Sequence, residues 1–291
     1  MTSKQRAYLY IISGAALWGL IGLFVKMLAA NGFTPMQIVA LRSIASAVCT
    51  LLLVCKLGFH YLRIDWRDSW LFIGTGILSL TFFNYCYFNC IDGSSLAVAA
   101  LLLYTAPIFV MLMSLLLFGE RFTLLKGIAL AMTFLGCGFV TGAFSGELNL
   151  TLAGLLYGLG SGFGYALYSI FGKYAVRKYP SLTITVQTFL FSVLASVPMA
   201  GFSSNLLQQI NSQVVLAMLG LGFICALIPY LLYTKGLEQV EAGQASILAT
   251  VEPFVAAGVG VLCFGEPLTA AKLTGMGLIF AAIVLLNIPR K

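Results

Sequence analysis

Ten apolar segments, separated by short polar or turn-rich gaps, follow one another along nearly the whole sequence. A helix needs about 20 apolar residues to cross the hydrocarbon core of a bilayer, and each segment reaches that length. No gap is long enough to fold into a soluble domain. The pattern predicts an all-α integral membrane protein with ten transmembrane helices. The segments are 7–29, 34–55, 69–89, 94–118, 124–144, 151–174, 181–202, 212–234, 242–264 and 269–288.

The composition excludes several other classes of protein. Of the 291 residues, 60% are hydrophobic and only 9% are charged, whereas soluble domains have roughly 45–50% apolar and about 25% charged residues. There are too few charges to cover a soluble surface, so a cytosolic enzyme and a disordered chain are both excluded. The seven cysteines lie almost wholly inside apolar segments, which indicates buried apolar side chains rather than a disulfide framework.

The distribution of basic residues predicts the orientation in the membrane. With ten crossings both termini share one side, and that side receives thirteen of the sixteen Lys and Arg residues. The opposite side receives only Lys26 and Lys272, while Arg42 falls inside a segment. Because basic loops stay in the cytoplasm, we expect both termini on the cytoplasmic side of a cytoplasmic (inner or plasma) membrane. Anchoring of this kind also explains the net charge of +7 without a nucleic-acid partner.

The second half of the sequence repeats the first at a shift of 146 to 147 residues. Ordered matches spread over several segments, which coincidence does not explain. Each repeat, 7–144 and 151–288, holds five segments. Because five is odd, the second copy must enter the membrane from the opposite face, which predicts two inverted five-helix repeats. The matches include Gly76 with Gly222, Pro107 with Pro253, Glu120 with Glu266, Lys126 with Lys272, Trp18 with Tyr165 and Lys26 with Lys173.

Two stretches of sequence resemble the signature of a known family. Residues 103–109 (LYTAPIF) continue to residues 117–123 (LFGERFT), and residues 251–254 (VEPF) continue to residues 264–269 (FGEPLT). They are similar to the EamA family, the ten-helix members of the drug/metabolite transporter superfamily. The resemblance covers essentially the whole chain. It implies a transporter, usually an exporter, and leaves the substrate open among amino acids, other metabolites, organic cations and drugs.

Glu252 is the one acidic residue that the segments place deep in the membrane, because the other eight acidic residues lie at segment ends or in loops. A charge at the bilayer centre costs at least about 2.5–3.5 kcal/mol, so such a residue normally faces a cavity or a partner. Three interpretations stay open: Glu252 neutralises a cationic substrate, carries a coupling proton, or bonds a neighbouring helix. The first repeat has Ala106 at the matching position, so the symmetry is broken where this charge lies.

Arg42 is the corresponding basic residue, about eight residues into the segment 34–55. It could neutralise Glu252, hold a substrate carboxylate, or extend toward the lipid headgroups. Glu252 favours a cationic substrate and Arg42 favours an anionic group. The two together leave the choice between an amino acid and an organic cation open.

Aromatic side chains at helical spacing predict the wall of a binding site. Tyr165 and Tyr168 lie three residues apart on one segment, and Trp18 occupies the place of Tyr165 in the first repeat. Trp18 lies near the middle of its segment, where an anchor at the membrane interface is not expected. Aromatic rings also bind cations through their faces. For any single ring, ordinary packing is the alternative.

Four polar residues in other segments complete the predicted substrate-binding set. Asn84 and Tyr87 interrupt the segment 69–89. An unpaired carboxamide in hydrocarbon is costly, so we expect these side chains to face the interior of the bundle. Tyr104 and Tyr230 are candidates of the same kind in segments 94–118 and 212–234, and Tyr233, in the second of these segments, is a further one.

The sequence offers little for other functions. His60 is the only histidine and lies in a loop, and no paired carboxylates or metal-ligand spacing accompany it, so we predict neither an enzyme nor a metal or cofactor site. No P-loop is present that would bind ATP. A secondary transporter of a small molecule by alternating access is the leading hypothesis. A passive facilitator or channel is the alternative, and an integral-membrane enzyme is a more distant one. A monomer and a homodimer are both open.

Overall fold

The computed structural model describes residues 2–144, 151–202 and 210–287, and every regular element in these ranges is helical. Two π-helical segments, η3 (Ile73–Thr81) and η4 (Gly220–Leu227), and two short 3-10 turns, η1 (Phe59–Leu62) and η2 (Trp66–Asp68), join the α-helices. In the first half these are α1 (Ser3–Trp18), α2 (Ile21–Ala30), α3 (Pro35–Leu57), α4 (Ser69–Phe72), α5 (Phe82–Asp92), α6 (Leu96–Leu103), α7 (Ala106–Phe118) and α8 (Leu124–Thr141). In the second half they are α9 (Leu152–Ala175), α10 (Ser181–Met199), α12 (Ser212–Leu219), α13 (Ile228–Leu237), α14 (Ala242–Leu248), α15 (Val251–Phe264) and α16 (Ala270–Asn287).

Polar caps and glycines fix several helix boundaries. At the start of α3, the Gln37 amide donates to Thr34 Oγ1 over 3.4 Å and the Thr34 amide donates to the Gln37 side chain over 3.0 Å, which is a capping box. Helices α7 and α15 end at Gly119 and Gly265, both with φ of +65°. Glycine adopts this left-handed conformation without a steric penalty. Short turns can therefore return the chain to the next helix.

Eight helical stretches of the described residues are long and apolar enough to cross a membrane. The predicted all-helical membrane architecture agrees with them. Two further segments expected from the sequence fold as α9 and α16, which fall outside this set. The glycine, serine and tyrosine residues of α9 lower its hydropathy, and the apolar part of α16 is shorter, at Ala270–Leu286. Ten crossings therefore stay a prediction. The eight are Ser3–Ala30, Pro35–Leu57, Trp66–Asp92, Leu96–Phe118, Leu124–Thr141, Ser181–Met199, Ser212–Leu237 and Ala242–Phe264.

Local backbone conformations recur in the two halves. The π-helical segment η4 lies about 146 residues after η3, and the left-handed glycine that ends α15 lies 146 residues after the one that ends α7. The chain also breaks twice in matching fashion, between α6 and α7 and between α14 and α15. Pro107 and Pro253 lie in the first turn after each break, where the missing N–H costs least. Each proline thus follows a junction between two helices and does not interrupt a continuous helix.

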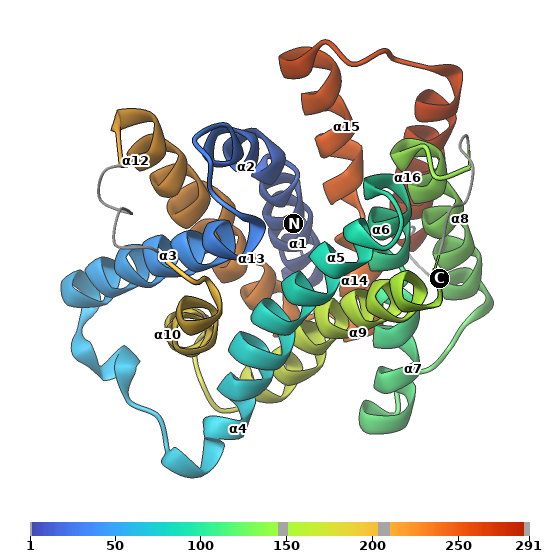
Figure 1. The fold of residues 1–291 in the computed structure, drawn as a ribbon. Coiled ribbons are helices and arrows are strands. Elements are labelled where there is room, and N and C mark those ends of the chain that lie inside the picture. The colour runs from blue at the N-terminus through green and yellow to red at the C-terminus, as the bar shows by residue number, and fades with distance from the viewer. Residues whose placement is uncertain (1, 145–150, 203–209, 288–291) are drawn as a thin grey trace.

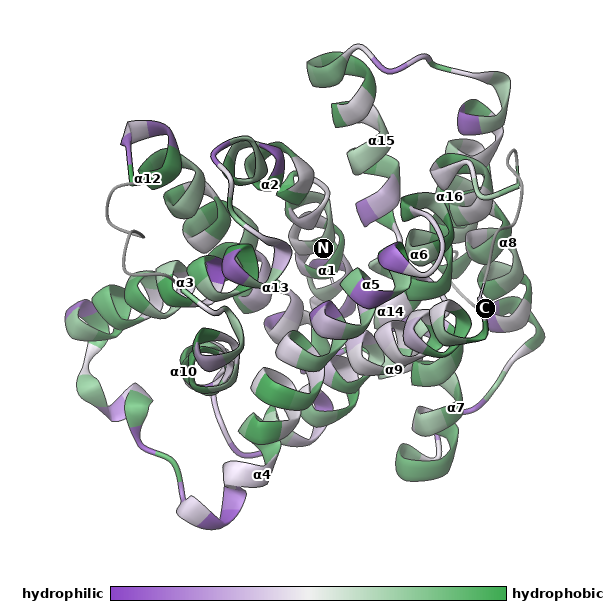
Figure 2. Ribbon diagram, viewed as in Figure 1, coloured by the Kyte–Doolittle hydropathy of each residue, from purple (hydrophilic) through white to green (hydrophobic). Residues whose placement is uncertain are grey.

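Helices of the two halves interleave (Figure 1). The main pairs are α1 with α13, α5 with α9, α3 with α10, and α8 with α16. In the last pair, a methyl group added at Gly136 or Gly275 would lie 2.8 or 2.5 Å from the carbonyl oxygen of the other glycine, so only small residues permit this approach. Figure 2 shows predominantly hydrophobic residues along the helices and hydrophilic residues at several helix ends and connections. The core accordingly contains side chains from both halves.

Candidate functional site

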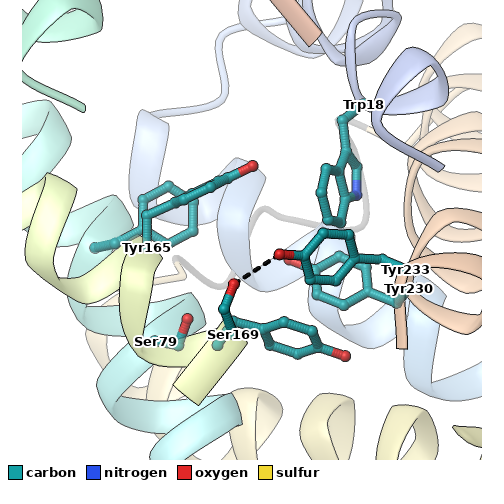
Figure 3. A pocket seen from close by; sticks show the side chains of 8 residues that line it. Trp18, Ser79, Tyr165, Ser169, Tyr230 and Tyr233 are labelled. Carbon is teal, nitrogen blue, oxygen red and sulfur yellow. Dashed lines mark hydrogen bonds between the residues drawn. The ribbon is translucent and has the colours of Figure 1, made fainter. Parts of the chain in front are cut away.

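A small pocket lies where helices of the two halves meet (Figure 3). Its free volume is about 10 Å³, which is room for about one water molecule. Among the lining residues, α9 supplies three and α13 supplies two. Helices α1 and α5 and the segment η3 supply one residue each. The lining residues are Trp18, Ser79, Phe83, Tyr165, Tyr168, Ser169, Tyr230 and Tyr233.

Trp18, at the last residue of α1, is the centre of the aromatic lining. Its ring centroid lies 5.2 Å from that of Tyr230, 5.3 Å from that of Tyr233 and 6.3 Å from that of Tyr165. Tyr168 meets Tyr230 edge to face at 4.9 Å. These are the separations at which aromatic pairs attract one another. One wall of aromatic rings thus spans α1, α9 and α13.

Hydroxyl groups tie the lining of α9 to that of α13. The Ser169 and Tyr233 hydroxyls are 2.7 Å apart, and the Tyr168 and Thr234 hydroxyls are also 2.7 Å apart. All four residues are buried. Buried hydroxyl groups without partners would be costly, so these bonds fix the orientation of the rings.

Glu252 adjoins this wall from the first turn of α15. The Tyr165 hydroxyl donates a hydrogen bond to Glu252 Oε2 over 2.9 Å. The start of a helix carries a positive partial charge, so this position stabilises an ionised carboxylate. Tyr87 and Tyr104 lie close enough for the Glu252 charge to act on their hydroxyl groups. Tyr165 is the one of these three tyrosines that bonds the carboxylate directly among the described contacts.

Arg42 approaches from α3, beside Tyr230, and its Nη2 donates to the Cys225 carbonyl oxygen over 3.3 Å. Its charge acts on Glu252 without a direct ion pair among the described contacts. Arg42 Nε and Trp18 Nε1 are both buried and have no hydrogen-bond partner among the described residues. Two N–H donors without acceptors near one pocket are unusual, since buried polar groups are normally paired.

The structure brings most of the predicted site residues together. Trp18, Tyr165, Tyr168 and Tyr230 line the pocket, and Glu252, Arg42, Tyr87 and Tyr104 lie around it. Asn84 differs, because its Nδ2 donates over 2.6 Å to the Leu80 carbonyl oxygen one turn earlier. One N–H of its carboxamide is thus bonded to the preceding turn of the chain, and Asn84 is not part of the pocket lining. The role of all the predicted site residues in substrate binding stays a prediction.

Three lining residues, Ser79, Phe83 and Ser169, were not among the predicted candidates. They give no signal in the sequence, because serine and phenylalanine are common in membrane helices of every kind. Tyr233, the further candidate in the segment of Tyr230, also lines the pocket.

A bundle of apolar helices around a small polar and aromatic pocket defines an integral-membrane protein of the transporter class. Comparison with known proteins agrees with this class. The family model described as EamA-like transporter family matches residues 5–142 and again residues 152–288. The chain belongs to the EamA-like transporter family, as the resemblance in residues 103–123 and 251–269 indicated.

Individual relatives carry transporter names. An uncharacterized transporter of Archaeoglobus fulgidus is 32% identical over 216 residues, which cover 72% of this chain and 75% of the relative. The threonine/homoserine exporter RhtA of Escherichia coli is 27% identical over 205 residues, covering 70% and 67% of the two chains. A solved crystal structure has the same fold, with a TM-score of 0.83 at 19% identity and 98% coverage of both chains.

Proposed function

We propose that the chain is a secondary transporter that exports a small organic metabolite, an amino acid or a related compound, by alternating access between two inverted five-helix repeats. The observation that carries this proposal is the pocket at the junction of the two halves, with the Glu252 carboxylate held by Tyr165 at its edge. Sites at a repeat interface suit alternating access, because motion of one repeat against the other exposes them to either side in turn.

The substrate class is argued from the charges around the pocket. Glu252 supplies a carboxylate for an ammonium group, and the free N–H groups of Arg42 and Trp18 supply donors for a carboxylate. An amino acid carries both groups, whereas an organic cation leaves the two donors unused. The relative named a threonine/homoserine exporter supports the same choice.

A thermal-shift panel on the purified protein tests this proposal. It contains threonine, homoserine and tetramethylammonium, with wild type compared with Glu252→Gln. A ligand at 100 times its Kd adds about 2.7 kcal/mol to the free energy of unfolding, so threonine or homoserine should raise the melting temperature of wild type and lose most of that effect in the variant.

The outcomes separate the interpretations of Glu252. Stabilisation by tetramethylammonium alone would replace the amino acid with an organic cation as substrate. Equal stabilisation of both proteins by an amino acid would leave Glu252 as a proton carrier or a structural residue. Uptake into proteoliposomes against a concentration gradient then distinguishes a coupled transporter from a passive facilitator, which only equilibrates its substrate.

A further inference from the structure

One end of the bundle holds a polar cluster that joins the α7–α8 turn to the start of α14. The Glu120 carboxylate accepts hydrogen bonds from the Ala242 amide over 2.7 Å and from the Gly243 amide over 3.1 Å. Lys126, which is buried, forms an ion pair with Glu241. The turn of the first half is thus bound to the second half through charge-assisted bonds, which are about twice as strong as neutral ones.

A third charged residue binds the same connection from α9. Lys173 Nζ donates to the carbonyl oxygens of Leu237 and Val240, each over 2.7 Å. The end of α13 carries negative partial charge and the start of α14 carries positive partial charge, so Lys173 and Glu120 complement them. All seven residues of α14 are buried. We refer to Glu120, Lys126, Lys173 and their partners in 237–243 as the first latch.

The repeat places an equivalent set at the α15–α16 turn, but its bonds are different. Glu266, Lys272 and Lys26 match Glu120, Lys126 and Lys173. Glu266 instead pairs with its own neighbour Lys272 over 2.9 Å. This bond holds the pKa of Glu266 below its ordinary value and keeps the carboxylate ionised. Glu266 and Lys272 are therefore charged and pair with each other rather than with residues 91–97.

The matching segment of the first half, residues 91–97, makes no described bond to Glu266 or Lys26, and it is more exposed than residues 237–243. Lys26 is exposed, with its Nζ 3.4 Å from the centre of the Phe264 ring. Leu96, at the start of α6, is 62% exposed, whereas its match Ala242 is fully buried. Helix α14 packs against α7, but α6 packs against α5, α8 and α9 instead. Residues 237–243 are thus bound by charged side chains, whereas residues 91–97 are held by neutral contacts, such as the hydrogen bond from Thr151 Oγ1 to the Gly93 carbonyl oxygen over 3.0 Å.

We propose that the two sets are alternating gates of the transport cycle. In the structure described above, the first latch closes the cytoplasmic end of the helix bundle. When that end opens, Glu266 accepts from the amides of Leu96 and Ala97, and Lys26 binds the carbonyls of Ile91 and Ser94. This inference rests on the proposed alternating access and on the orientation that the basic residues predict.

One difference between the two gates determines which of them is closed in the absence of substrate. Ser95 stands where the first latch has Glu241, and its hydroxyl caps α6 by accepting from the Val98 amide over 3.2 Å. The second gate therefore lacks the ion pair that Lys126 makes. With fewer charge-assisted bonds available at the second gate, the state with the first latch closed is favoured in the absence of substrate.

Hydrogen exchange of the full-length protein in nanodiscs tests the gates. The variants are Glu120→Ala and its repeat-matched control Glu266→Ala. In Glu120→Ala, we expect exchange in residues 242–248 to rise about tenfold, since bonds to charged groups contribute about 1.5–3 kcal/mol, and exchange in residues 96–103 to fall. Glu266→Ala should leave residues 242–248 protected, and the double variant should lose the fall in residues 96–103.

The fall in residues 96–103 is the decisive observation, because unfolding would raise exchange in both segments. A rise confined to residues 242–248 would make Glu120 a helix cap only and overturn the gates. The transport assay separates this result from the proposed function. If wild type moves no substrate but the two segments respond in opposite directions, the conformational exchange stands and the assignment as a transporter fails.

Discussion

At the residue scale, the pocket is a set of aromatic rings, and three of its tyrosine hydroxyls make hydrogen bonds to other helices. Tyr165 bonds to Glu252, Tyr168 to Thr234 and Tyr233 to Ser169. Each bond joins two different helices, so the rings cannot rotate independently of the helices that hold them. Preorganisation of this kind fixes the position of the carboxylate before any ligand arrives.

The substitution Tyr165→Phe removes one of these hydroxyls and leaves the ring in place. We expect the free energy of unfolding to fall by about 1.5–3 kcal/mol, because the lost bond is made to a carboxylate. We also expect a weaker stabilisation by threonine, measured as the ligand-dependent shift in melting temperature. Tyr174→Phe on the same helix, where the ring packs on Phe118 at 4.8 Å, is the matched control. Equal behaviour of the two variants would contradict the role of the Tyr165–Glu252 bond.

At the element scale, the two π-helical segments lie beside the site in both halves. η3 supplies Ser79 to the pocket, and η4 supplies the Cys225 carbonyl that accepts from Arg42. Such segments are rare and are found frequently at functional sites. Each also carries a glycine against a neighbouring helix: a methyl group at Gly76 would lie 2.5 Å from the Thr188 carbonyl oxygen, and one at Gly222 would lie 2.7 Å from the Ala45 Cβ.

The substitution Gly76→Ala should therefore force η3 away from α10. We expect a loss of about 1–3 kcal/mol in the free energy of unfolding, the usual cost of overpacking. Gly277→Ala in α16 is the control, since a methyl group there meets no atom within 4 Å and alanine is the better helix former. Thermal unfolding of both variants measures the difference. A destabilised Gly277→Ala with an unchanged Gly76→Ala would show that the close approach of η3 and α10 does not limit stability.

At the scale of the whole molecule, the two halves are not separate lobes, because α1 of the first half packs on α13 of the second and α5 packs on α9. A pocket built between them must change shape whenever these pairs move. The charge distribution also predicts the orientation of the molecule in the membrane, with thirteen basic residues on one side and two on the other.

Fusion reporters at the C-terminus measure on which side of the membrane that terminus lies. We expect a fluorescent-protein fusion to be fluorescent and an alkaline phosphatase fusion to be inactive, because basic loops hold the C-terminus in the cytoplasm. A fusion after Gly119, in the basic α7–α8 turn, should behave in the same way. Active phosphatase at either position would reverse the assigned orientation, and with it the side that the first latch closes.

The all-helical membrane fold could be predicted because hydropathy is a local property of the chain, and the family because its motifs are short stretches of sequence. The same holds for Trp18, Tyr165 and Glu252, which are unusual residues for their positions. The breaks before Pro107 and Pro253, the π-helical segments and the serines of the pocket depend on packing between distant helices, which no single stretch encodes. Asn84 is a separate case, because it is not part of the pocket lining and its Nδ2 donates to the Leu80 carbonyl oxygen of the preceding turn.

The small volume of the pocket has a consequence for how a substrate enters. The space among the rings of Trp18, Tyr230 and Tyr233 holds about one water molecule, whereas a molecule the size of an amino acid is several times larger. The rings must therefore move apart before a substrate of that size can bind, so occupancy of the pocket and a rearrangement of the helices that carry the rings are coupled.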